Sequence, residues 1–242
     1  AKPFLNVQKI HADSYVQETS SGGARYTLVT KAIFDALEVG AIVVNYFGHG
    51  GEDGLAGERI FDKINAQELT NPTKLNCFVT VTCEYTKFDN PFRETAGEYL
   101  FWNKKGGAIN LITTTRKIYV NVGTSFNKTL SQYLFSYGSN LTISVGEALR
   151  RTKNDPAISN QTQRRLVFNI GDPAIKLPIA NPDIRITKIN DEDINTSTQL
   201  LKALDTAKIE GTVTDAQGTI LSNYNGILTA SIYDKDLQRT TL

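Results

Sequence analysis

Residues 76–91, NCFVTVTCEYTKFDNP, run from an alternating apolar pattern directly into a polar turn that ends at a proline. The alternation over 76–83 predicts a buried β-strand, and Cys83 stands where that strand opens into a loop. An earlier stretch, AIVVNYF (41–47), predicts a second buried strand, which the glycine-rich GHGGEDG ends. Neighbouring parallel strands end at the same edge of a sheet, where ligands of open α/β sheets bind. The two loops are therefore the first candidates for a functional site.

The rest of the first 150 residues alternates between apolar periods of 3.6 and 2. Helices are predicted over 24–40, 65–71, 94–104, 122–136 and 143–153, and a third strand over 107–115. Asn65 is the expected N-cap of the short second helix. This order of elements predicts an α/β protein with a doubly wound, mostly parallel sheet. From residue 183 onward the pattern changes to short strands with turns, so we expect a first domain at 1–182 and the start of a β-sandwich at 183–242.

Composition excludes several classes of function. Lys and Arg total 26 and Asp and Glu total 25, so the net charge is +1, which gives no reason to expect nucleic acid or an anionic membrane as a partner. The longest apolar run, at 41–47, is far too short to span a membrane. The chain begins Ala-Lys-Pro and contains no Met, so we expect it to be a piece of a longer polypeptide.

The two cysteines are predicted to be free thiols. Cys77 and Cys83 lie on one predicted strand, which would hold them about 20 Å apart when extended. A disulfide needs Cα atoms within roughly 7 Å, and a tetrahedral zinc site would need similar proximity. Cys77 is expected to be a small core residue.

His49, in the loop after 41–47, and Cys83 would meet at one sheet edge if the two strands are neighbours. A thiol becomes a nucleophile as its thiolate, and an adjacent imidazole is the usual device that produces it. The backbone N–H groups of Gly50 and Cys83 are then natural oxyanion donors. No third side chain that would orient His49 can be identified. A core cysteine and a surface-loop histidine are the alternatives, and the spacing alone leaves both open.

Four segments in chain order resemble the gingipain-type cysteine peptidases. They are NYFGHGGEDG (45–54), FVTVTCEYTKFDNP (78–91), GGAINLITTTRKIY (106–119) and NIGDPAIKLP (169–178). Within this family, the segments are most similar in sequence to the PorU-like branch, the cell-surface sortases of the type IX secretion system. The resemblance implies a caspase-like α/β fold with His49 as general base and acid, Cys83 as nucleophile, and Gly50 and Cys83 as oxyanion donors. It also implies that 183–242 begins an immunoglobulin-like β-sandwich.

The resemblance further implies a function. Such a protein removes the C-terminal sorting domain from type IX-secreted proteins through a thioester on Cys83, and attaches the product to surface lipopolysaccharide. Cargo proteins and outer-membrane components of the secretion system would be its partners, at the bacterial outer membrane surface or outside the cell. No cofactor is required, and the sequence neither demands nor excludes structural calcium.

Three further residues are predicted to border the substrate pocket. Tyr119 follows the third strand, where the family places pocket walls, and Glu52 and Glu84 flank the dyad, where they would disfavour acidic substrates. An exposed loop aromatic and solvated loop charges are the plain alternatives. Two rival functions remain, a secreted gingipain-like general protease and a catalytically silent adhesion or scaffold module.

Overall fold

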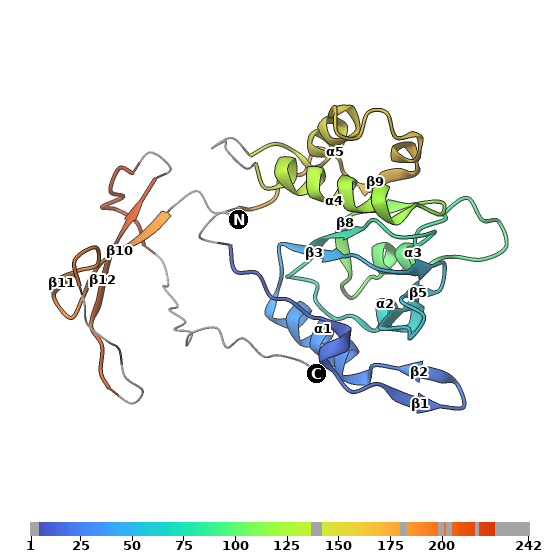
Figure 1. The fold of residues 1–242 in the computed structure, drawn as a ribbon, viewed down its shortest axis with the longest axis horizontal. Coiled ribbons are helices and arrows are strands. Elements are labelled where there is room, and N and C mark those ends of the chain that lie inside the picture. Colours follow the sequence, from blue (N-terminus) through green and yellow to red (C-terminus); the bar gives the residue numbers. More distant parts are fainter. Residues whose placement is uncertain are drawn as a thin grey trace. The chain divides into compact units, whose positions relative to one another are not determined.

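A four-stranded sheet in the order β3-β7-β8-β9 organises the first part of this computed structural model (Figure 1). β3 (Val43–Tyr46) pairs in parallel with β7 (Asn76–Thr80), and β7 pairs in parallel with β8 (Ala108–Thr114). β9 (Val167–Gly171) is antiparallel to β8. The predicted α/β class is confirmed, and the structure adds one antiparallel edge strand. The structure describes residues 5–136, 142–179, 183–197, 201, 205–215 and 218–225.

Helices cover both faces of this sheet, as a doubly wound fold requires. They are α1 (Thr27–Val39), α2 (Lys63–Glu68), α3 (Ala96–Trp102), α4 (Val120–Leu134) and α5 (Val145–Asn154). On one face α4 and α5 pack on a core that includes Val79, Ile112 and Phe126. On the other face α1, α2 and α3 enclose Phe78 and Leu111. Successive residues of β7 and β8 thus serve opposite layers, because side chains alternate along a strand.

Two predicted boundaries were wrong. β7 ends at Thr80, so Val81, Thr82 and Cys83 already belong to the loop. The N-cap of α2 is Asp62, whose carboxylate accepts hydrogen bonds from the backbone N–H groups of Ile64 and Asn65. The Asn65 side-chain oxygen instead accepts a hydrogen bond from the Asp62 N–H at 3.0 Å, which completes a capping box.

Short elements absent from the sequence prediction surround the sheet. They are the hairpin β1 (Glu18–Ser20) and β2 (Gly23–Arg25), the small sheet of β4 (Gly50–Gly51), β5 (Gly54–Leu55) and β6 (Phe61–Asp62), and the 3₁₀ turns η1 (Ala12–Ser14) and η2 (Thr162–Leu166). The β4–β5 hairpin of this small sheet is built from the glycine-rich loop. GHGGEDG is therefore an ordered antiparallel structure rather than an open turn.

The chain divides into two units, Ala1–Ile179 and Ala180–Leu242. In the second unit β10 (Asp183–Ile189) lies between β11 (Glu192–Asp193) and β12 (Ile209–Thr214), and both pairings are antiparallel. Residues 226–242 lie outside the described part of the chain. The immunoglobulin-like assignment of this unit stays a prediction.

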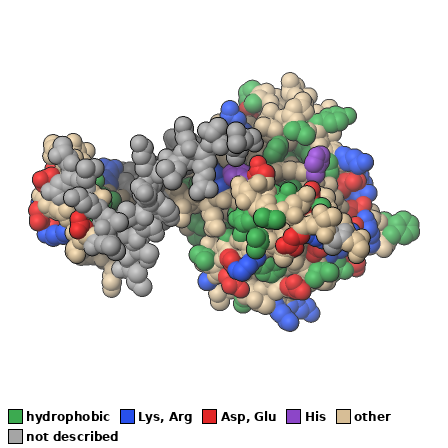
Figure 2. All heavy atoms as spheres, turned by 60° about the horizontal axis from the view of Figure 1, so that its bottom comes forward, with side chains coloured by type: hydrophobic (Ala, Val, Ile, Leu, Met, Phe, Trp, Pro, Cys, Tyr) green, Lys and Arg blue, Asp and Glu red, His purple; other side chains and the backbone are tan. Residues whose placement is uncertain are grey.

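None of the helices within the described ranges has the length and apolar character needed to cross a bilayer. On the face drawn in Figure 2, acidic and basic side chains are intermixed over the surface.

Candidate active site

The loops that carry His49 and Cys83 lie side by side. The last register pair of β3 and β7 is Tyr46 with Thr80, and each candidate residue stands three positions beyond its strand. The Thr82 hydroxyl donates a hydrogen bond of 2.6 Å to the Gly48 carbonyl oxygen. This bond joins the residues that directly precede His49 and Cys83, so the two loops are fastened together at the point where the chemistry is expected.

His49 is exposed, and its backbone is held firmly. The His49 carbonyl oxygen accepts hydrogen bonds from the Ala56 N–H at 2.8 Å and from the Tyr46 hydroxyl at 2.6 Å. Burial raises the pKa of Tyr46 to about 12, so this hydroxyl stays a neutral donor. Within the described ranges no side chain hydrogen-bonds to the imidazole.

The two thiols occupy different environments. Cys83 is half-buried, and its Sγ lies 3.8 Å from the Ile118 carbonyl oxygen, a weak S–H donor contact. Cys77 is 1% exposed in the core, and burial raises its pKa to about 12. Both are free, as predicted. Cys83 alone combines access to solvent with a place beside the histidine loop.

The Gly50 N–H is left outside the β4–β5 ladder. The Ala56 N–H to His49 bond makes residues 49 and 56 a hydrogen-bonded pair, so the next pair, Gly50 with Leu55, is a non-hydrogen-bonded one. The Cys83 N–H makes no hydrogen bond within the described part of the chain. Both predicted oxyanion donors are therefore spare backbone N–H groups.

Buried threonines anchor the turn that carries Cys83. The Thr114 hydroxyl, from β8, donates to the carbonyl oxygen of Thr82. The Thr113 hydroxyl lies between those of Thr80 and Thr86, at 3.0 and 2.9 Å. Sequence reasoning missed this role, although the runs TVT (80–82) and TTT (113–115) at two strand ends are a visible signal.

Glu84, directly after Cys83, adopts a left-handed backbone with φ of 52°. This conformation is uncommon for a residue with a side chain and reverses the chain just after the thiol. The Glu84 carboxylate accepts from Lys87 at 3.2 Å. Glu52 accepts from Lys87, Asn90 and Arg93. Burial would raise the pKa of Glu52, but the hydrogen bonds from Arg93, Lys87 and Asn90 outweigh it and lower that pKa to about 2.

Tyr119 is placed near the thiol. It is 72% exposed and follows Ile118, whose carbonyl oxygen contacts Cys83. The Gln163 side chain fixes this segment by accepting from the Tyr119 N–H at 2.9 Å and donating to the Lys117 carbonyl oxygen at 3.2 Å. Pocket roles for Tyr119, Glu52 and Glu84 stay predictions, and both carboxylates are already occupied by cations of the protein.

An open surface pocket of about 260 Å³ lies between the end of β3 and α4. Its lining residues are Phe47, Thr124, Asn127, Lys128 and Ser131. None of the residues predicted from the sequence lines it. Within the described residues, no group of three or more His, Cys, Asp or Glu side chains is arranged to hold a metal ion.

Residues 1–178 match the sequence model of peptidase family C25. The chain belongs to this family. Family C25 consists of cysteine peptidases and includes the gingipains, so the predicted family is confirmed. No curated protein matches the chain.

Solved structures of C25 peptidases share the fold. The Arg-specific cysteine proteinase gingipain R (RgpB) matches with a TM-score of 0.53 and 19% identity, over 65% of this chain and 39% of its own. The complex of Porphyromonas gingivalis RgpB pro- and mature domains matches with a TM-score of 0.52 and 20% identity, over 65% of this chain and 40% of its own. A further protease structure matches with a TM-score of 0.51 and 16% identity, over 78% of this chain and 50% of its own. This C25 chain therefore has the caspase-like fold of the gingipains and spans about two fifths of the RgpB chains it matches.

Proposed function

We propose that the chain acts as a cysteine peptidase through a dyad of His49 and Cys83. The observation that carries this proposal is the Thr82 to Gly48 hydrogen bond, which couples the two loops one residue before each candidate. Membership of a cysteine peptidase family supports the same chemistry. Of the two cysteines, Cys83 is partly exposed and Cys77 is buried, which favours Cys83 as the nucleophile.

The reaction follows from these groups. The His49 imidazole takes the proton of the Cys83 thiol, and the thiolate attacks the carbonyl carbon of the scissile peptide bond. The oxyanion that forms accepts hydrogen bonds from the Gly50 and Cys83 N–H groups. His49 then returns the proton to the leaving amine, and a thioester remains on Cys83. Attack by water gives hydrolysis, and attack by an amine gives transpeptidation.

The substrate we propose is the junction between a secreted cargo protein and its C-terminal sorting domain, with an amine on surface lipopolysaccharide as acceptor. This places the protein at the bacterial outer surface with the type IX secretion machinery as partner. The proposal rests on the similarity of residues 45–54 and 78–91 to the PorU-like branch. Tyr119, exposed beside Cys83, is the side chain we propose for the pocket wall.

Thiol labelling tests the dyad. Iodoacetamide should alkylate Cys83 rapidly near pH 7, and His49→Ala should slow the reaction to the rate of an ordinary exposed thiol. Cys77 serves as an internal control in the same molecule. Equal rates in the wild type and His49→Ala would support the catalytically silent module and refute the dyad.

Substrate choice requires a second assay. Wild type and Cys83→Ala proteins, in their full-length form, are supplied with cargo that carries its sorting domain and with an unstructured peptide library. Cleavage confined to the junction, lost in Cys83→Ala, supports the sortase. Broad cleavage of the library supports a general gingipain-like protease instead.

A further inference from the structure

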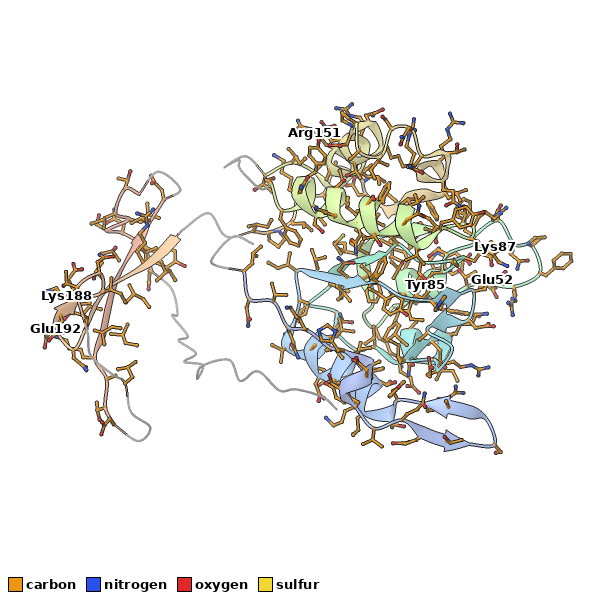
Figure 3. The ribbon with its side chains drawn as sticks, in the orientation of Figure 1. Glu52, Tyr85, Lys87, Arg151, Lys188 and Glu192 are labelled. Carbon is orange, nitrogen blue, oxygen red and sulfur yellow. The ribbon has the colours of Figure 1, made fainter. Side chains whose placement is uncertain are left out.

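Four charged side chains form a cluster between the two candidate loops. They are Glu52, Glu84, Lys87 and Arg93, here called the Glu52 cluster. The Lys87 ammonium lies 3.1 Å from Glu52 Oε1 and 3.2 Å from Glu84 Oε1, so it bridges both carboxylates. Arg93 Nε lies 2.9 Å from the other Glu52 oxygen. Figure 3 shows Glu52 and Lys87 next to each other beyond the sheet.

The cluster connects the two reacting positions through side chains. Glu52 stands three residues after His49, and Glu84 stands one residue after Cys83. Lys87 therefore links the histidine loop to the cysteine loop through two ion pairs. The Glu52 carbonyl oxygen also accepts from the Ala96 N–H, at the start of α3, at 2.8 Å. Glu52 is thus tied to the segment after Cys83 by its backbone as well as by its side chain.

The bridge is partly shielded from solvent. The exposed fractions are 11% for Glu52, 22% for Glu84 and 26% for Lys87. Ion pairs in such surroundings are screened less by salt than fully exposed pairs. The hydrogen bonds that Lys87 donates to Glu52 and Glu84 raise the pKa of Lys87, and the pKa of Glu52 is about 2. Glu52 and Lys87 are therefore both charged over the whole pH range in which a thiol titrates.

Several charges in the surroundings are also paired. Asp53 accepts from Lys63 at 2.9 Å and from Arg93 at 3.4 Å, and Arg116 pairs with Asp89 at 2.6 Å. The cluster itself holds two carboxylates and two cations. It is electrically balanced and has little residual charge to offer a substrate, so a positional role explains it better than recognition.

We propose that Lys87, by bridging Glu52 and Glu84, is a positioning residue that holds the His49 loop at the distance from Cys83 that proton transfer requires. The proposal rests on the proposed dyad and adds the device that aligns it. Loss of the bridge would free the left-handed turn at Glu84 and let the β4 segment move away from the thiol. A displacement of about 1 Å in a reacting group can cost on the order of 100-fold in rate.

The test is the pH dependence of Cys83 alkylation in variants of the bridge. Lys87→Met should slow labelling at pH 7 by about tenfold or more and move the profile toward that of His49→Ala. Lys87→Arg, which keeps the charge, should retain most of the rate. Glu52→Gln removes one pair with little change of shape and should act in the same direction, and it keeps the test open if Lys87→Met fails to fold.

Glu147→Gln is the matched control for Glu52→Gln. Glu147, on α5, also accepts from two arginines, and hydrogen bonds from Arg150 and Arg151 lower its pKa to about 2. Its partner Arg151 lies well away from Glu52 in Figure 3. This variant should leave the labelling profile of Cys83 unchanged, whatever its effect on stability.

A double-mutant cycle separates positioning from a merely structural role. If the bridge acts through His49, Lys87→Met should have almost no further effect in the His49→Ala background. An equal slowing in both backgrounds, or a lowered melting temperature with an unchanged pH profile, would overturn the inference and leave the dyad intact. If the wild type shows no dependence on His49, the dyad fails first and the inference falls with it.

Discussion

Gly50 packs directly against the side chain of Thr82, so that a Cβ added to Gly50 would lie 2.6 Å from Thr82 Cγ2 and 2.8 Å from its hydroxyl oxygen. Thr82 is 2% exposed and hydrogen-bonded on both its hydroxyl and its carbonyl oxygen. It has no room to give way. The close approach of the two loops therefore depends on the absence of a side chain at the residue after His49.

Gly50→Ala should destabilise the protein by about 1–3 kcal/mol, the usual cost of forcing extra atoms into a packed site. Gly51→Ala is the control, since a Cβ there would meet no atom within 4 Å and the residue lacks a positive φ. Urea denaturation compares the two. Equal midpoints would mean that the loops separate easily and that the contact does not hold them.

Removal of the Thr82 hydroxyl should cost about 1–2 kcal/mol, because a buried hydrogen bond to the Gly48 carbonyl oxygen is lost. Thr82→Val keeps the shape of the side chain, and Thr82→Ser keeps the hydroxyl. We expect Thr82→Val to slow iodoacetamide labelling of Cys83 as well, and Thr82→Ser to stay closer to wild type in rate. Wild-type stability and labelling in Thr82→Val would show that this hydrogen bond does not couple the two loops.

Cys77 should resist alkylation at pH 8 while the protein is folded, because it is 1% exposed and its pKa is raised to about 12 by burial. Peptide mapping by mass spectrometry after brief treatment should find the label on Cys83 alone. Both cysteines should react in denaturant, which checks the reagent. Early modification of Cys77 under native conditions would show that the core under β7 opens readily.

Stability should depend on the charge of Glu52 in acid. Its pKa in the folded protein is about 2, against an ordinary 4.5, so its contribution is fully present above about pH 4.5 and is lost as the pH falls toward 2. Glu52→Gln should be less stable than wild type at pH 6, and the gap should shrink over that window. The difference between the urea midpoints of wild type and Glu52→Gln, taken at several pH values, measures this gap.

Asp35→Asn provides the comparison for this series. The Asp35 carboxylate pairs with Lys31 on the outer face of α1, where the two side chains are 57% and 67% exposed. Exposed pairs of this kind contribute little, so its midpoint should stay near that of wild type at each pH. A gap between Glu52→Gln and wild type that remains constant down to pH 2.5 would contradict the proposed charge dependence.

Local patterns predicted the three parallel strands of the sheet and the helices that cover it. The buried runs at 41–47 and 107–115 contain β3 and β8, and the helix pattern at 122–136 overlaps α4, which begins two residues earlier. They could be predicted because alternation and helical period are local properties of the chain. β9 and the β1–β2 hairpin were not predicted, since a short strand is stabilised by pairing that local sequence does not encode.

In the candidate site, too, some features could be predicted from local sequence and others could not. His49 and Cys83 could be singled out because a histidine among glycines and a cysteine at a strand end are unusual side chains at a sheet edge. The partners that fasten them were not visible in the sequence. Glu52 was read as a pocket charge, yet its carboxylate is bound by Lys87, Asn90 and Arg93, which lie 35 or more residues further along.

The sequence by itself determined the family, the α/β class and the two reactive residue types, because each is written in short contiguous segments. The tertiary structure decided which backbone carbonyl Thr82 binds, which thiol is accessible and what neutralises Glu52. These depend on contacts between residues distant in the chain, and the parallel pairing of β3 with β7 brings the loops that carry Gly48 and Thr82 side by side.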